Sequence, residues 1–338
     1  MQTPHKIPAA DFDLTVPIHI FDNSSLDAFG NCNRSYLFRY IRGLSGWKGA
    51  DPMEFGSASH KFLEGYYSGK SITDALQMFI SRAKEESSDI PEFAQQAVDS
   101  GKVPEYSMEF GVWLMSKYAE IRPREFDDLE PICIDGDYYI EKGFAVDIDN
   151  AGVLVGKFDM LARKRSGDSR IWIVDHKTTK AVLNDRYFNF WSPNNQVTTY
   201  LMAARELLGE TPAGFILNII RVKDFKRGKI DDNQQKLFAR IEVKKSDAQL
   251  DERKKQIAWN MKWINYIRDK GISAFSQRAP SACHSWYGDC PFIPLCMAQT
   301  EELTELLIES AYKKDPWSPY ELAGEGGVKE IMVGDSLL

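Results

Sequence analysis

Apolar residues in the first third of the chain recur every three or four positions, which is the spacing of an amphipathic helix that packs one face on a core. This spacing predicts helices over residues 24–43, 52–69, 71–86 and 109–121. Ser24 or Ser25 is placed to cap the first of these helices. The apolar positions of that helix are Leu26, Phe29, Leu37 and Tyr40.

The pattern then changes to the alternation of strands joined by tight turns. Three strands are expected over residues 131–149, 152–165 and 170–178, and residues 166–169 form the hairpin loop between the last two. A helix, two strands, a long helix and a short helix follow, over residues 194–209, 214–224, 236–246, 246–270 and from Thr300. This order predicts an α/β fold with a small, mixed central sheet flanked by helices.

The composition is that of an ordinary soluble globular protein, with 43% hydrophobic and 27% charged residues in 338. No apolar run approaches the roughly 20 residues that span a membrane. The N-terminal segment has no long apolar stretch of the kind found in secretory signals, so we expect a cytoplasmic protein. Five cysteines, an odd number in a large chain, do not suggest a secreted disulfide framework.

The net charge of -7 counts against a protein that holds DNA mainly by neutralising phosphates. It does not exclude DNA, because the basic residues are unevenly placed and a metal-binding acidic centre itself lowers the net charge. One basic group lies near the start of the chain and a second near residue 225; they are Arg34, Arg39, Arg42, Lys48, Arg221, Lys223, Lys226, Arg227 and Lys229.

The apolar strand at residues 171–174 runs directly into Asp175, His176 and Lys177. Because side chains alternate along a strand, Asp175 and Lys177 share one face. By itself this pattern also fits an exposed ion pair at the end of a strand. The preceding strand, however, carries Asp159 among apolar neighbours. Two carboxylates on neighbouring strands suit a hard divalent cation, and a lysine beside them can orient an attacking water.

These residues and several others, in this order, resemble the PD-(D/E)XK nuclease superfamily, and in particular its RecB-like exonucleases. Asp159, Asp175 and Lys177 fit the D-x(15)-D-x-K pattern, and Gly156 begins a G-x-x-D motif. Each motif alone is weak, but together they cover about residues 24–300. The family's G-x-x-x-H-x-x-L-E and Q-x-x-x-Y helix motifs match Gly56, His60, Leu63, Glu64, Gln196 and Tyr200.

The resemblance implies a role for each of these positions. Asp159 and Asp175 would bind Mg²⁺ or Mn²⁺, with His60 and the main-chain carbonyl of His176 as further ligands. Lys177 would hold the attacking water. The two helix residues that would contact DNA or position that lysine are Gln196 and Tyr200. The third motif position carries aspartate rather than glutamate, which the superfamily allows. Glu141, on the strand before Asp159, is interpreted as an exposed strand residue. The alternative is that it supports the metal ligands from behind.

Three late cysteines follow the pattern Cys283-x6-Cys290-x5-Cys296, and Cys32 is a candidate fourth ligand. Four thiolates can hold a [4Fe-4S] cluster or Zn²⁺. One early and three late cysteines resemble the layout of the AddB nuclease domain and the CRISPR-associated exonucleases, which implies an iron–sulfur cluster. The first late gap is longer than the usual two residues, so Zn²⁺ and unliganded cysteines stay as alternatives. Cys133 lies in an apolar strand and is expected in the core.

The resemblance thus implies a metal-dependent DNA exonuclease that acts in recombination, repair or DNA processing, such as a phage or bacterial enzyme. DNA, as single strands or duplex ends, would be its partner, with a helicase or recombinase as a separate protein. The alternative is a catalytically silent relative that binds DNA or a partner nuclease. The expected parts are a helical region with Cys32 and His60, a nuclease core, a cysteine-cluster segment and a flexible tail, over residues 1–125, 126–270, 271–314 and 315–338.

Overall fold

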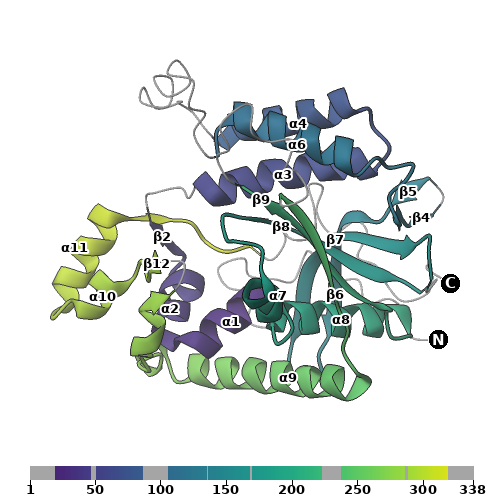
Figure 1. Ribbon diagram of the computed structural model, residues 1–338. Coiled ribbons are helices and arrows are strands. Elements are labelled where there is room, and N and C mark those ends of the chain that lie inside the picture. Colours follow the sequence, from purple (N-terminus) through teal and green to yellow (C-terminus); the bar gives the residue numbers. More distant parts are fainter. Residues whose placement is uncertain are drawn as a thin grey trace.

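A mixed β-sheet forms the centre of the molecule (Figure 1). The computed structural model describes residues 20–46, 51–86, 106–134, 136–167, 170–222, 237–285 and 288–318. Within these residues the sheet has seven strands in the order β1-β7-β8-β9-β10, and β3 and β6 also pair with β7. The strands are β1 (Ile20–Phe21), β3 (Leu129–Pro131), β6 (Ile140–Asp147), β7 (Val153–Lys164), β8 (Trp172–Thr179), β9 (Gly214–Arg221) and β10 (Phe238–Val243). The predicted fold class is confirmed.

Helices cover both faces of the sheet, because the strands in the middle of the sheet bury side chains on both faces. One face packs on α3 (Asp51–Tyr67), α4 (Ile72–Glu86) and α6 (Met108–Ile121). The other face packs on α1 (Asn23–Asn31), α8 (Asn195–Leu208) and α9 (Asp247–Asp269). Figure 1 shows the first group above the sheet and α8 and α9 below it. The two apolar cores are therefore separated by the sheet that carries the candidate acidic residues.

The polar residues at the ends of these helices explain where they begin and stop. At the start of α9, the Ser246 side chain accepts the N–H of Gln249, whose side chain in turn accepts the N–H of Ser246, forming a capping box. Helix α8 ends at Gly209, which has a φ of 72° and adopts the left-handed conformation that glycine allows without strain. Thr300 caps α11 (Glu301–Ala311), as its position before an apolar run indicates.

The helix expected over residues 24–43 is broken in the structure. Helix α1 ends before Cys32, which is extended with a φ of -163°, and α2 (Asn33–Tyr36) begins after it, followed by a π-helical turn, Leu37–Ile41. Gly30 and Asn31 are weak helix formers, which favours a break at this point. The N-cap of α1 is Asp22 rather than either predicted serine; Ser25 occupies the third helical position and completes a capping box with Asp22.

Two further expectations for the middle of the chain are wrong. The strand expected over residues 131–149 is divided into the small hairpin of β4 (Cys133–Ile134) and β5 (Asp137–Tyr138), followed by β6. Cys133 is exposed on this hairpin and is not a core residue. The sequence pattern also missed α7 (Asp185–Trp191), a short helix that lies between β8 and α8 and is capped by Asn184.

The C-terminal part of the described chain packs against its beginning. Strand β13 (Tyr312–Lys314) pairs antiparallel with β2 (Leu44–Gly46), and α10 (Ile293–Met297) and α11 lie beside α2 in Figure 1. Asp315 and Trp317, in the expected tail, contact Arg39 and Tyr40. The shorter elements here are 3-10 turns at Ile272–Ala274 and Pro280–Ala282 and the hairpin of β11 (His284–Ser285) and β12 (Gly288–Asp289).

Several sequence-based expectations lie outside the described residues. They are most of the tail, at residues 319–338, the last half of the hairpin loop, at residues 168–169, and basic residues Lys48, Lys223, Lys226, Arg227 and Lys229.

Gly156 in β7 allows two aromatic rings to stack over the strand. A Cβ atom at this position would lie 2.4 Å from the ring of Phe144, which is stacked at 4.4 Å on Phe158. Both rings are buried, so neither can move aside into solvent. The glycine of the G-x-x-D motif is thus required by close packing of β6 on β7.

We predict that Gly156→Ala lowers the free energy of unfolding by about 1–3 kcal/mol, because the new methyl group overpacks a closed core. Urea denaturation followed by circular dichroism measures this change. Gly30→Ala is the matched control: no heavy atom lies within 4 Å of its Cβ position, and alanine favours the helix by up to about 1 kcal/mol. Equal stability of the two variants would contradict the packing argument.

Candidate active site

The candidate site begins where β7 and β8 separate. Their antiparallel register runs from Ala162↔Trp172 to Met160↔Val174 and stops there. The next pair in this register would be Asp159 and Asp175, opposite each other. Instead, Oδ2 of Asp159 accepts the main-chain N–H of His176 at 2.8 Å. A carboxylate thus takes the place of a backbone acceptor, and both aspartates lie at the point of divergence, beyond the last recorded pair.

Strands β6 and β7 are irregular at the same level. Glu141 has a φ of 54°, a left-handed conformation that costs free energy in a residue with a side chain. Strict alternation would place residues two or four apart on one face. Ile140 and Met160, however, belong to the core under α3, whereas Phe144 and Phe158 belong to the opposite core. The faces of both strands therefore exchange around Glu141, and its side chain is turned toward the site.

His60, Glu141 and Asp159 form one cluster, whose ligand atoms all lie within 4.8 Å of one another. His60 Nδ1 is 3.2 Å from Glu141 Oε1 and 3.6 Å from Asp159 Oδ2. The interpretation of Glu141 as an exposed strand residue is wrong, since its side chain is only 12% exposed. One feature of the sequence could have indicated this position of Glu141: it is an acid on the strand that pairs with the strand of Asp159.

Helix α3 brings His60 over the end of β8. His60 Nε2 lies 3.1 Å from the main-chain carbonyl of His176, so the carbonyl that the resemblance assigns to the metal does face the cluster. Glu141 also pairs with Lys157 on β7. The cluster is therefore assembled by residues from α3, β6 and β7, with the backbone of β8 beside it.

Asp175 lies next to this cluster and is turned toward Lys177 and Gln196. Lys177 Nζ donates to Asp175 Oδ1 at 3.0 Å and lies 2.7 Å from Oδ2. Gln196 Nε2 donates to the same Oδ1 at 3.1 Å. The contact with Oδ2 lacks hydrogen-bond geometry, so this buried oxygen has no hydrogen-bond partner. The lysine also lies 5.9 Å from the ring centre of Trp191 on α7.

Gln196 and Tyr200 differ in what they contact. Gln196, in the first turn of α8, holds Asp175 rather than the lysine. Tyr200, one turn later, packs edge-on against the rings of Phe144 and Phe158 at 5.5 and 5.8 Å. Tyr200 thus lies beneath the site, against the aromatic pair that packs over Gly156.

The site concentrates negative charge. Burial raises the pKa of Asp159; the charge of His60 lowers it, but the charges of Asp175 and Glu141 raise it further, and the net shift is upward. Burial lowers the pKa of His60, yet the carboxylates of Asp159 and Glu141 outweigh burial and raise it overall. The pKa of Lys177 is likewise raised, because Asp175 and Asp159 outweigh its burial. Added positive charge would therefore be stabilised here.

The donor set fits a divalent cation such as Mg²⁺ or Mn²⁺. It offers two carboxylates and an imidazole within one cluster, with the His176 carbonyl beside them. Oxygen ligands suit Mg²⁺, and an imidazole among carboxylates suits Mn²⁺. The buried Asp175 oxygen without a hydrogen bond and the raised pKa of Asp159 both fit a site that stabilises a bound cation.

A family model described as "PD-(D/E)XK nuclease superfamily" matches residues 23–297, a span that contains all these side chains. The chain belongs to this superfamily. A solved structure titled "Crystal structure of SSO0001" aligns with 78% of this chain and 86% of its own, at 11% identity and a TM-score of 0.31, which is too low to support an argument. No match was found among curated proteins.

A hydrogen-bonded network supports the superfamily site from behind. His176 stacks on Tyr67 at 5.9 Å, and its Nδ1 lies 2.9 Å from Asn218 Nδ2 on β9. Arg240 donates to Asn218 Oδ1, which leaves the amide NH₂ to donate to His176. Burial holds the pKa of His176 well below its ordinary value, so the ring is neutral. Asp127 accepts hydrogen bonds from Arg240 and Tyr67 and closes the network.

The early basic residues that we considered for DNA binding have partners inside the molecule. Arg39 pairs with Asp315, Arg42 pairs with Glu305, and Arg34 lies 4.9 Å from the ring centre of Phe38. The two ion pairs join the beginning of the described chain to its C-terminal segment, whereas the Arg34 contact is local. No helix in the described part of the chain is long and apolar enough to cross a membrane.

Asp127→Asn should lower the free energy of unfolding by about 3 kcal/mol or more, because it leaves the buried guanidinium of Arg240 without its counter-charge. Burial raises the pKa of Asp127, but the hydrogen bonds and charge of Arg240 lower it more, so the net shift is downward. The stabilisation is then complete above the ordinary carboxyl pKa and is lost as the pH falls through the lowered value.

Urea denaturation of wild type and Asp127→Asn between about pH 7 and pH 3 measures both effects. The difference between the two proteins should shrink toward the acid end. Asp137→Asn is the control, since Asp137 is 57% exposed and its removal should change stability by less than about 0.5 kcal/mol. A difference that grows as the pH falls would exclude the ion pair as its cause.

Proposed function

We propose that this protein is a Mg²⁺- or Mn²⁺-dependent DNA exonuclease. The observation that carries the proposal is the position of the His60–Glu141–Asp159 cluster beside the Asp175–Lys177 pair, where two strands of the superfamily sheet diverge. In this arrangement the candidate metal ligands, the ammonium group of Lys177 and the point where β8 leaves β7 lie close together. The superfamily hydrolyses nucleic acids with divalent metals; the restriction to DNA and to strand ends is the finer part of the proposal.

In this proposal the cation would be held by His60, Glu141, Asp159 and Asp175, with the His176 carbonyl. The chemistry that a bound divalent ion would supply there is that of a Lewis acid, for a phosphate and a water. Lys177, held by Asp175, donates hydrogen bonds that orient the attacking water and the phosphate oxygens. Gln196 fixes the Asp175 carboxylate and thus the position of Lys177, and Tyr200 supports the turn of α8 that carries Gln196.

Such an enzyme would act on DNA ends during recombination, repair or DNA processing, and any helicase or recombinase would be a separate partner. The competing function is a catalytically silent protein that binds DNA or a nuclease through the same surface. The complete set of Asp159, Asp175 and Lys177 favours catalysis, because a binding protein needs no buried acid cluster of this kind.

We expect Asp175→Asn and Lys177→Ala each to reduce cleavage roughly 100-fold or more, since each removes a group that orients or stabilises reacting atoms. End-labelled linear and closed circular DNA, single- and double-stranded, would be incubated with Mg²⁺, Mn²⁺ or EDTA. Linear substrates should be degraded only with metal, and circular substrates should persist.

Lys142→Ala is the control for cleavage, because Lys142 lies on β6 but pairs with the exposed Asp137. An Asp175→Asn protein that cuts at the wild-type rate would disprove the site assignment. Cleavage of circular DNA would show that the enzyme is an endonuclease rather than an exonuclease. Metal-independent binding of DNA without any cleavage would favour the silent relative.

We also propose that Cys32, Cys283, Cys290 and Cys296 hold a structural metal centre. Burial raises the pKa of Cys290, a main-chain hydrogen bond of Phe292 lowers it, and the charges of Cys296, Cys283 and Cys32 raise it, as thiols in the neighbourhood of Cys290 would. The main-chain N–H of Cys290 donates to the carbonyl of Cys283 at 2.8 Å. Cys32 reaches this group because the break between α1 and α2 falls at its position.

We take a [4Fe-4S] cluster as the centre and Zn²⁺ as its alternative, because one early and three late cysteines resemble the layout of the iron–sulfur nucleases named above. Four thiolates can hold either group.

Cys32→Ser should abolish the centre and lower the melting temperature, because the binding free energy of a structural metal is also folding free energy. Anaerobically purified wild type should be brown and should bleach with dithionite, and its iron and sulfide content gives the cluster stoichiometry. Cys133→Ser is the matched control, since that cysteine is exposed and remote from the group, and it should keep both colour and stability. Colourless protein with stoichiometric zinc would show that the centre binds Zn²⁺ rather than an iron–sulfur cluster.

A further inference from the structure

The outward face of α9 carries large aromatic side chains in a row. Trp259, Trp263 and Tyr266 are 70%, 43% and 52% exposed, and the last two stack at 5.4 Å with their planes 16° apart. Their spacing of four and three residues places them on one side of the helix. Exposed apolar groups gathered in this way mark an interaction surface more often than singly scattered ones.

Lysines alternate with these rings on the same helix face. Lys255 and Lys262 precede Trp259 and Tyr266 by four residues, and both are exposed. Lys270, just beyond the helix, lies 5.2 Å from the ring centre of Tyr266. The surface thus combines flat apolar rings with exposed positive charges, in a chain whose net charge is -7.

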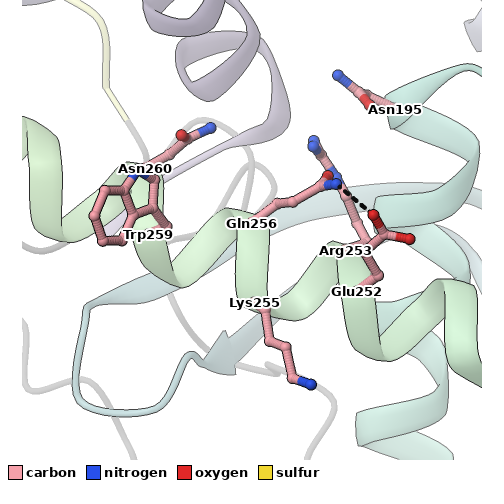
Figure 2. Close-up of a pocket in the computed structure, with 7 residues that line it drawn as sticks. All are labelled: Asn195, Glu252, Arg253, Lys255, Gln256, Trp259 and Asn260. Carbon is pink, nitrogen blue, oxygen red and sulfur yellow. Dashed lines mark hydrogen bonds between the residues drawn. The ribbon is translucent and has the colours of Figure 1, made fainter.

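Two adjoining grooves connect this face with the start of α8. The first groove has a volume of about 560 Å³ and is lined by Trp259 and Gln256, among others. The second has a volume of about 420 Å³ and is lined by Phe190 and Pro193, among others. Asn195, Arg253 and Asn260 line both. Figure 2 shows Asn195 across from Arg253 and Gln256, with Trp259 and Asn260 farther along the helix.

The second groove lies near the candidate active site, because two of its lining residues adjoin Trp191 and Gln196, although no site residue lines the groove itself. Phe190 is 51% exposed and contacts the ring of Trp191 at 5.6 Å, and Trp191 in turn lies 5.9 Å from Lys177 Nζ. Asn195, at the other wall, directly precedes Gln196, which binds Asp175. A molecule lying along α9 and through both grooves would therefore reach the side of the site where Lys177 lies.

We propose that Phe190, Trp259, Trp263 and Tyr266, which we call the aromatic track, bind single-stranded DNA and lead it to the active site. Unpaired bases stack on exposed rings whatever their sequence, and lysines between the rings accompany the phosphates. In a duplex the base faces are already stacked, so the track selects single strands. This inference rests on the proposed nuclease function and specifies its substrate.

Binding can be measured without cleavage, in EDTA, by the fluorescence anisotropy of a labelled oligo(dT) of about 30 nucleotides. Trp259→Ala, Trp263→Ala and Tyr266→Ala should each weaken binding roughly 5- to 100-fold, the loss of one stacked base. A Lys255→Ala/Lys262→Ala double variant should reduce the dependence of affinity on salt. Phe126→Ala is the matched control, because Phe126 is 88% exposed between α6 and β3.

Cleavage of long and short strands separates this inference from the nuclease function. With Mg²⁺, Trp259→Ala should raise KM for the strand of about 30 nucleotides but leave cleavage of one of about four nucleotides unchanged. Loss of binding in the track variants of a protein that never cuts DNA would support the track and refute the nuclease.

Wild-type affinity in all three aromatic variants would overturn the track, whatever the nuclease activity. So would a wild-type dimer, detected by light scattering, that Trp263→Ala converts to a monomer with unchanged DNA affinity. That result would assign the α9 face to self-association.

Discussion

The hydrogen bond from the His176 N–H to the Asp159 carboxylate is the contact on which the site depends. A buried backbone N–H must have an acceptor, and inside a sheet the neighbouring strand normally supplies a carbonyl. Here the acceptor is a side chain, so β8 can leave β7 after Val174 without leaving that donor unpaired. The divergence in turn leaves the carbonyl of His176 facing His60 on α3.

This arrangement needs support on both sides, because charged groups are costly to bury without partners. In front of His176, the acids are partly balanced by His60, Lys157 and Lys177. Behind it, Asn218 connects the neutral imidazole to the buried pair of Arg240 and Asp127. The acid cluster thus contacts the backbone of His176, the ion pair is linked to its ring through Asn218, and the two apolar cores hold the strands that carry them.

Contacts between distant parts of the chain surround the same region. The paired strands β2 and β13 and the ion pairs of Arg39 and Arg42 hold the C-terminal segment against α2, where the proposed cysteine centre lies. Helix α9 packs on α8 and α1 with its buried face and leaves its aromatic face outward. The proposed centre and the aromatic track are therefore both outside the acid cluster, joined to it through α1, α7 and α8.

The sequence by itself determined the fold class, most of the helices and strands and the membership of the superfamily, because periodicity and short motifs are local properties. It also named His60, Asp159, Asp175, Lys177 and Gln196, which the structure brings together. The sequence offered Glu141 only as an alternative, and the tertiary structure decided that it lies in the acid cluster. Its role depends on a left-handed backbone and a change of faces shared by two strands, and neither leaves a periodic signal in one strand. The break at Cys32 and the exposed hairpin of Cys133 are local departures that periodicity missed. The packing of the C-terminal segment on Arg39 and Arg42, in contrast, was decided by contacts between segments far apart in the chain.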